Sequence, residues 1–87
     1  MFKKRRGIKL SYNKQGLIYF TCMNYDDMPE YIQHKVRVLC WEVTLDHCEA
    51  LFKVLTDSNE TIRSVAFKYH ISETQLYHYR KKFYEMW

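Results

Sequence analysis

Apolar residues recur every three or four positions through most of this chain, and that spacing buries one face of a helix. The longest such stripe lies around residues 29–43 and consists of Met28, Ile32, Val36, Leu39 and Val43. Pro29 suits the first turn of a helix, where its missing N–H is not needed. The pattern therefore predicts a helix over 29–43.

Three further helices are predicted, over residues 46–56, 60–69 and 73–87. Possible capping residues precede them, namely Asp46 with Glu49, then Ser58 or Asn59, then Ser72 with Gln75. A short turn separates the last two helices, and the small side chain of Ala66 allows them to cross closely. This arrangement predicts a helix-turn-helix core whose last helix is free to enter a DNA major groove.

Residues 8–25 have a different pattern. Ile8, Leu10 and Tyr12 alternate with polar residues, residues 13–16 resemble a turn, and residues 17–22 favour strands. We therefore expect a β-hairpin over 8–25, packed on the helices. The predicted fold is mainly α, and residues 1–87 form a single helix-turn-helix domain.

Charge is unevenly distributed along the 87 residues, although the net charge is only +4. Residues 1–20 carry six basic residues and no acidic one, and residues 61–87 carry five basic against two acidic residues. Residues 21–60 carry three basic against eight acidic residues. Both ends of the chain could therefore grip a polyanion.

The first seven residues form a basic N-terminal arm that contains Lys3, Lys4, Arg5 and Arg6. Arms of this composition contact phosphates or the minor groove in some DNA-binding domains. The same composition is also typical of a solubilising tail without a specific ligand. Both interpretations remain open from the sequence.

The last predicted helix has two distinct faces. Leu76, Tyr79, Phe83 and Trp87 point inward, whereas Thr74, His78 and Lys81 point outward. Contacts with the edges of the DNA bases concentrate near the N-terminus of such a helix. Basic side chains farther along the helix contact the backbone phosphates. The predicted DNA-contacting residues are Ser72, Glu73, Thr74, Tyr77, His78, Arg80, Lys81 and Lys82, together with Lys3, Lys4, Arg5 and Arg6 of the arm.

The segment Thr61-Ile62-Arg63, with Ala66, Tyr69 and Ile71-Ser72, resembles bacterial helix-turn-helix regulators of the sporulation stage III regulator D type. Residues 72–87 are also similar to small prophage-encoded proteins that end like the fourth region of a sigma factor. The resemblance covers residues 58–87 and implies a bacterial or phage transcription regulator. His70 stands where most of those proteins have glycine.

Other classes of function have weaker support. Cys22, Cys40 and Cys48 are expected to be free thiols; a zinc site at Cys40, His47 and Cys48 lacks any paired-cysteine motif. The chain has no hydrolase, metalloprotease or phosphate-loop motif, so we expect neither enzymatic activity nor a cofactor. It also lacks a signal peptide or a membrane span, which favours a cytoplasmic, nucleoid-associated protein.

The sequence thus predicts a sequence-specific DNA-binding transcription regulator that places helix 73–87 in the major groove of double-stranded DNA. The alternative is a protein-interaction module that binds RNA polymerase or another regulator through its aromatic surface. Helix 29–43 could also mediate a homodimer, because a three-helix core need not use its apolar stripe.

Overall fold

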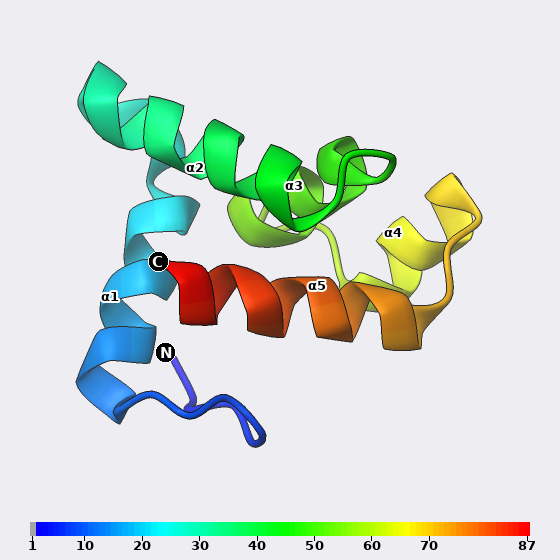
Figure 1. Ribbon diagram of the computed structural model, residues 1–87, viewed down its shortest axis with the longest axis horizontal. Coiled ribbons are helices and arrows are strands. Elements are labelled where there is room, and N and C mark those ends of the chain that lie inside the picture. Colours follow the sequence, from blue (N-terminus) through cyan, green and yellow to red (C-terminus); the bar gives the residue numbers. More distant parts are fainter. Residues whose placement is uncertain (1) are drawn as a thin grey trace.

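The computed structural model describes residues 2–87, and Met1, the first residue of the predicted arm, lies outside them. Five α-helices follow one another (Figure 1): α1 (Tyr12–Met23), α2 (Glu30–Val43), α3 (Cys48–Thr56), α4 (Ile62–Tyr69) and α5 (Glu73–Met86). A single 3₁₀ turn, η1 (Tyr25–Asp27), links α1 to α2. In Figure 1, α5 crosses the middle of the molecule, with α2 along one side and the N-terminal segment on the other.

The predicted β-hairpin over residues 8–25 is wrong, because this region forms α1 and residues 2–87 contain no strand. Residues 13–16, predicted as a turn, form the first turn of the helix instead. Ser11 caps that turn, since its hydroxyl accepts a hydrogen bond from the Lys14 amide at 3.2 Å. A turn and a first helical turn have similar local sequences, so only the residues beyond them could distinguish the two.

The spacing of the buried side chains explains why residues 12–23 form a helix and not a strand. Gln15, Ile18 and Cys22 are all buried, at spacings of three and four residues. A strand would instead bring Ile18 and Phe20 to one face, yet Phe20 is 50% exposed. The strand propensity of residues 17–22 is therefore overridden by tertiary packing.

The four later helices confirm the predicted mainly α fold, with boundaries within two residues of those expected. The apolar stripe of α2 is used within the chain, because α2 packs against both α3 and α5. Tyr31 and Trp41, on the other side of α2, stay exposed. The buried stripe removes the original reason for expecting a homodimer through this helix.

The core has two parts that meet at Tyr79 of α5. The larger part joins α1, α2, α3 and the second half of α5, where Phe83 is completely buried. The smaller part joins α3, α4 and the first half of α5 around Val65 and Leu76. At the C-terminus, the Lys35 ammonium lies 4.1 Å from the centre of the Trp87 ring and links α2 to α5. The first half of α5 thus packs mainly against α3 and α4.

The helix starts differ in detail from the predicted ones. The Asp46–Glu49 capping box does not form, since α3 begins at Cys48 and the Thr44 hydroxyl accepts from the His47 amide at 3.2 Å. Helix α4 is capped by Thr61 rather than by Ser58 or Asn59.

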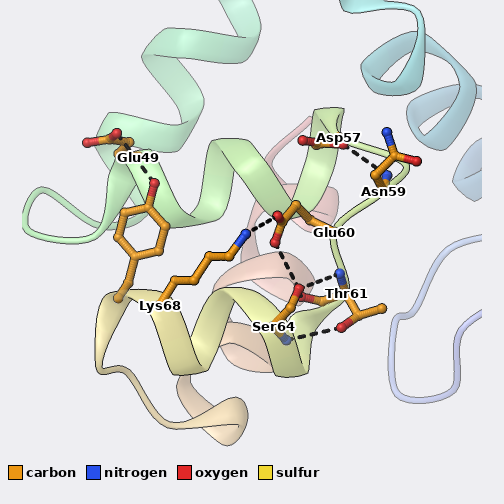
Figure 2. Close-up of polar contacts among 8 residues, drawn as sticks. Glu49, Asp57, Asn59, Glu60, Thr61, Ser64 and Lys68 are labelled. Carbon is orange, nitrogen blue, oxygen red and sulfur yellow. Dashed lines mark hydrogen bonds and ion pairs between the residues drawn. The ribbon is translucent and has the colours of Figure 1, made fainter.

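A reciprocal pair of hydrogen bonds fixes the start of α4 (Figure 2). The Thr61 hydroxyl accepts from the Ser64 amide at 3.0 Å, and the Ser64 hydroxyl accepts from the Thr61 amide at 2.9 Å. The Ser64 hydroxyl also lies 2.8 Å from a carboxylate oxygen of Glu60, which pairs with Lys68. This network sets the direction in which α4 leaves the preceding loop.

Thr61→Ala is expected to lower the free energy of unfolding by about 1 kcal/mol, because the α4 amide it caps loses its acceptor. Urea unfolding followed by circular dichroism measures this change. Ser58→Ala in the same loop is the matched control and should change stability by less than about 0.5 kcal/mol, as Ser58 is exposed. Equal effects of both substitutions would contradict the capping role.

Candidate nucleic-acid interface

The turn between α4 and α5 consists of His70, Ile71 and Ser72. His70 adopts the left-handed conformation, with φ 56° and ψ 44°, so histidine fulfils the role for which glycine is usual. The Ile71 amide donates to the Ala66 carbonyl at 3.0 Å, and the Ile71 side chain is buried in the smaller part of the core. Ser72 caps α5 as predicted, by accepting from the Gln75 amide at 3.0 Å. The turn thereby fixes the start of α5 relative to α4.

Ala66 is buried in this part of the core, alongside Val65 and Leu76. Ala66→Leu is therefore expected to overpack the contact and to destabilise the protein by about 1–3 kcal/mol. Phe67→Leu, at an adjacent position that is 84% exposed, serves as the control and should have little effect. Thermal unfolding of both variants tests the prediction, and wild-type stability of Ala66→Leu would exclude a close crossing.

The outer face of α5 is open to solvent over its first turns. Thr74, Tyr77 and His78 are exposed, with 51% exposure for Tyr77, and Lys81 is half-buried. Three other predicted contact residues, Ser72, Glu73 and Lys82, are exposed as well. None of these seven side chains is part of the buried core. The face is therefore available to a ligand.

The N-terminal segment, residues 2–10, is folded onto α1 rather than extended. Phe2 is buried, and its ring centre lies 5.6 Å from that of Tyr12 and 5.1 Å from that of Tyr19. Ile8 is buried in the larger part of the core. The basic residues between Phe2 and Ile8 are thus anchored at both ends.

Gln15 of α1 holds the N-terminal segment in place through side-chain hydrogen bonds. From the sequence, Gln15 was predicted only to lie in a turn. Its side chain is 0% exposed. Its amide oxygen accepts from the Arg5 amide at 2.9 Å, and its amide nitrogen donates to the carbonyls of Ile8 and Leu10 at 3.2 and 3.1 Å. A buried amide with three partners fixes the path of residues 5–10.

The anchored segment and α5 enclose a groove of about 240 Å³, which we term the basic groove. It is lined by Arg5, Arg6, Ile8, Thr74, Tyr77, His78, Arg80 and Lys81. The groove brings together the two basic ends of the chain, and seven of its eight lining residues were predicted to contact DNA. Lys3 and Lys4 are exposed on the same segment, whereas Lys82 does not line the groove.

The Arg80 side chain, which was predicted to contact a phosphate, is packed against a tyrosine ring and partly buried. Its guanidinium carbon lies 5.1 Å from the centre of the Tyr77 ring, and its Nε is buried. Burial, and secondarily the charge of Arg5, lowers the pKa of Arg80 to about 10. The side chain therefore keeps its charge at neutral pH.

Tyr84 and Tyr19 are the residues at this site that the sequence had not singled out. Burial raises the pKa of the Tyr84 hydroxyl, against an opposing effect of the adjacent Arg5 guanidinium. The Arg5 guanidinium carbon also lies 5.9 Å from the centre of the Tyr19 ring. Both contacts join residues distant in sequence, and no local motif marks them.

No protein-family model, curated protein or solved structure matches this chain significantly. The resemblance of residues 58–87 to helix-turn-helix regulators thus gains no support from known proteins. The functional interpretation rests on the arrangement of α4, α5 and the N-terminal segment.

The cysteines form neither a disulfide nor a metal site within residues 2–87. Cys22, Cys40 and Cys48 are free, and burial raises the pKa of the Cys22 and Cys40 thiols to about 12. Residues 2–87 contain no group of three or more His, Cys, Asp or Glu side chains placed to share a metal ion. In the same range, no helix is both long and apolar enough to span a bilayer.

Proposed function

We propose that this protein is a sequence-specific DNA-binding transcription regulator of bacterial or phage type, with the first turns of α5 in the major groove. One observation carries the proposal: Arg5 and Arg6 line the same groove as Thr74, His78 and Lys81. A cationic surface on and beside the second helix of a helix-turn-helix unit has the properties that duplex recognition requires.

The residues of this surface divide into two roles. Thr74, Tyr77 and His78 lie on the first turns of α5, are exposed, and carry groups that can contact base edges or the thymine methyl. Lys81 and Arg6 line the basic groove and would contact backbone phosphates. The 14 residues of α5 span about 21 Å, which is long enough for the helix to lie along the major groove of DNA.

Titration of the protein with a duplex selected from a random pool tests the proposal. About five phosphate contacts predict a slope of log affinity against log salt of roughly −4 to −5. Lys81→Ala should make the slope shallower by about one, while Lys53→Ala, an exposed lysine of α3, should not change it. Absence of an enriched sequence, or affinity independent of salt, would contradict the proposal.

A protein-interaction role through the aromatic surface is the second candidate, and one specific feature favours it. Trp41 is 58% exposed beside an apolar groove of about 320 Å³ that is also lined by Cys40, Cys48 and Phe52. Aromatic side chains beside apolar grooves are common at protein interfaces. This surface could receive RNA polymerase, another regulator or a second copy of the chain, and Trp41→Ala would weaken that association without affecting DNA binding.

A further inference from the structure

Two arginine side chains at the inner end of the basic groove have unused hydrogen-bonding capacity. The Nε atoms of Arg5 and Arg80 are both shut off from solvent, and neither has a hydrogen-bond partner. Buried N–H donors are nearly always satisfied in folded proteins, and an unmet donor on a charged group is especially unfavourable. These two groups therefore mark a position where an acceptor is missing.

The two arginine side chains line the same groove, so their positive charges lie near each other. The positive charge of Arg5 acts on Arg80, in a region where burial already disfavours charge. Tyrosine rings flank the pair, with Tyr19 beside Arg5 and Tyr77 beside Arg80. Two like charges in a partly desolvated position repel each other unless an anion lies between them.

Within residues 2–87, no free carboxylate lines the spaces that border the pair. Arg5, Tyr77 and Arg80 separate the basic groove from a second hollow of about 320 Å³, and the acidic residue on the walls of these two spaces is Glu60. Glu60 is already engaged, because it accepts a hydrogen bond from Ser64 and pairs with Lys68 (Figure 2). An anion from outside the chain would therefore offset the charge of the pair.

We propose that Arg5 and Arg80 form one phosphate-binding site, which takes a backbone phosphodiester of the bound duplex. The proposal rests on the proposed function, because the two arginines border the groove that also contains Thr74 and His78. Guanidinium groups match phosphate oxygens with paired, charge-assisted hydrogen bonds. Gln15 acts as a positioning residue, since its amide oxygen holds the Arg5 backbone at 2.9 Å.

This site would make the N-terminal segment a fixed part of the interface, in contrast to a mobile arm. Arg5 is supplied by the segment and Arg80 by the second half of α5. A phosphate between them would set the register of α5 along the duplex, because it fixes one backbone position relative to the base-contacting turns. The site thereby adds a positional constraint that α4 and α5 alone do not provide.

The first test follows the arginine Nε–Hε signals by nuclear magnetic resonance while inorganic phosphate is added to the chain of residues 1–87. We expect saturable shifts of the Arg5 and Arg80 signals, and no comparable shift for Arg63, an exposed arginine of α4. Arg5→Gln should abolish the shift of the Arg80 signal. Unchanged Arg5 and Arg80 signals would overturn the site, whether or not the protein binds DNA.

The second test measures duplex affinity for Arg5→Gln, Arg80→Gln and the double variant, with Lys53→Gln as the control. Each single substitution should weaken binding roughly tenfold, and the double variant should lose little more than either single one. Circular dichroism checks that each variant is folded. If Arg80→Gln is unfolded, Arg80→Lys, which keeps the charge, replaces it in the measurement. If the loss of affinity in the double variant equalled the product of the two single losses, a shared site would be overturned. The same holds if the single variants bound DNA as tightly as Lys53→Gln.

The two tests separate the two proposals. Phosphate shifts in a protein that binds no duplex would support an anion site and contradict the DNA-binding function. Tight, salt-dependent duplex binding that is insensitive to Arg5 and Arg80 would support the function and overturn the phosphate site.

Discussion

Replacement of Thr74, His78 and Lys81 together by alanine is expected to weaken binding to the preferred duplex by about 100-fold or more. Each well-placed base contact contributes roughly 1–3 kcal/mol of discrimination, and a phosphate contact adds to overall affinity. Thr74 and His78 are exposed and Lys81 is half-buried at the groove, so the fold should tolerate the change. Fluorescence anisotropy with labelled duplex measures the loss.

A matched control uses exposed residues of the same types on α2 and α3. His34→Ala with Lys53→Ala should leave duplex affinity within about twofold of wild type, because neither residue lines the basic groove. A triple variant that binds the preferred duplex as tightly as this control would show that the outer face of α5 does not read DNA.

Phe83→Ala is expected to have the largest effect on stability, a loss of about 3–5 kcal/mol. Phe83 is 0% exposed at the centre of the larger part of the core, with its ring centre 5.9 Å from that of Trp87. A domain of this size has a total stability of roughly 4–13 kcal/mol, so much of the population should unfold at moderate temperature. Urea and thermal unfolding give the value.

Met86→Ala tests whether the loss of stability in Phe83→Ala comes from burial of the Phe83 side chain and would not follow from truncating any side chain of α5. Met86 lies on the same helix but is 40% exposed, so its truncation should change stability by less than about 1 kcal/mol. If Phe83→Ala were no more destabilising than Met86→Ala, α5 would not be docked against α1, α2 and α3 in the way described.

Much of the helical fold can be predicted from the sequence, because α2 to α5 have one-sided apolar stripes. The α2 stripe predicts both its limits and its buried face, from Val36 to Val43. The turn before α5 was also predictable, since Ser72 has a clear capping position and His70 tolerates the left-handed conformation. For α5, the inward and outward sets follow directly from its helical period.

The N-terminal part could not be predicted in the same way, for two physical reasons. Residues 17–22 favour strands locally, and only the burial of Ile18 and Cys22 against other helices makes them helical. The position of Arg5 depends on the buried amide of Gln15, and Arg5 lines the basic groove together with Arg80, 75 positions away. Such long-range contacts leave no periodic signal, so the walls of the basic groove became evident only in the folded chain.

Mapping of the duplex on the protein by backbone amide shifts tests the DNA-binding proposal most directly. Isotope-labelled protein would be titrated with a duplex selected from a random pool, at moderate salt. We predict that the largest shifts fall on residues 72–81 and on residues 5–8, the two segments that contain the lining of the basic groove. Shifts centred on Trp41 and Phe52, or no shifts at any duplex concentration, would contradict DNA binding through α5.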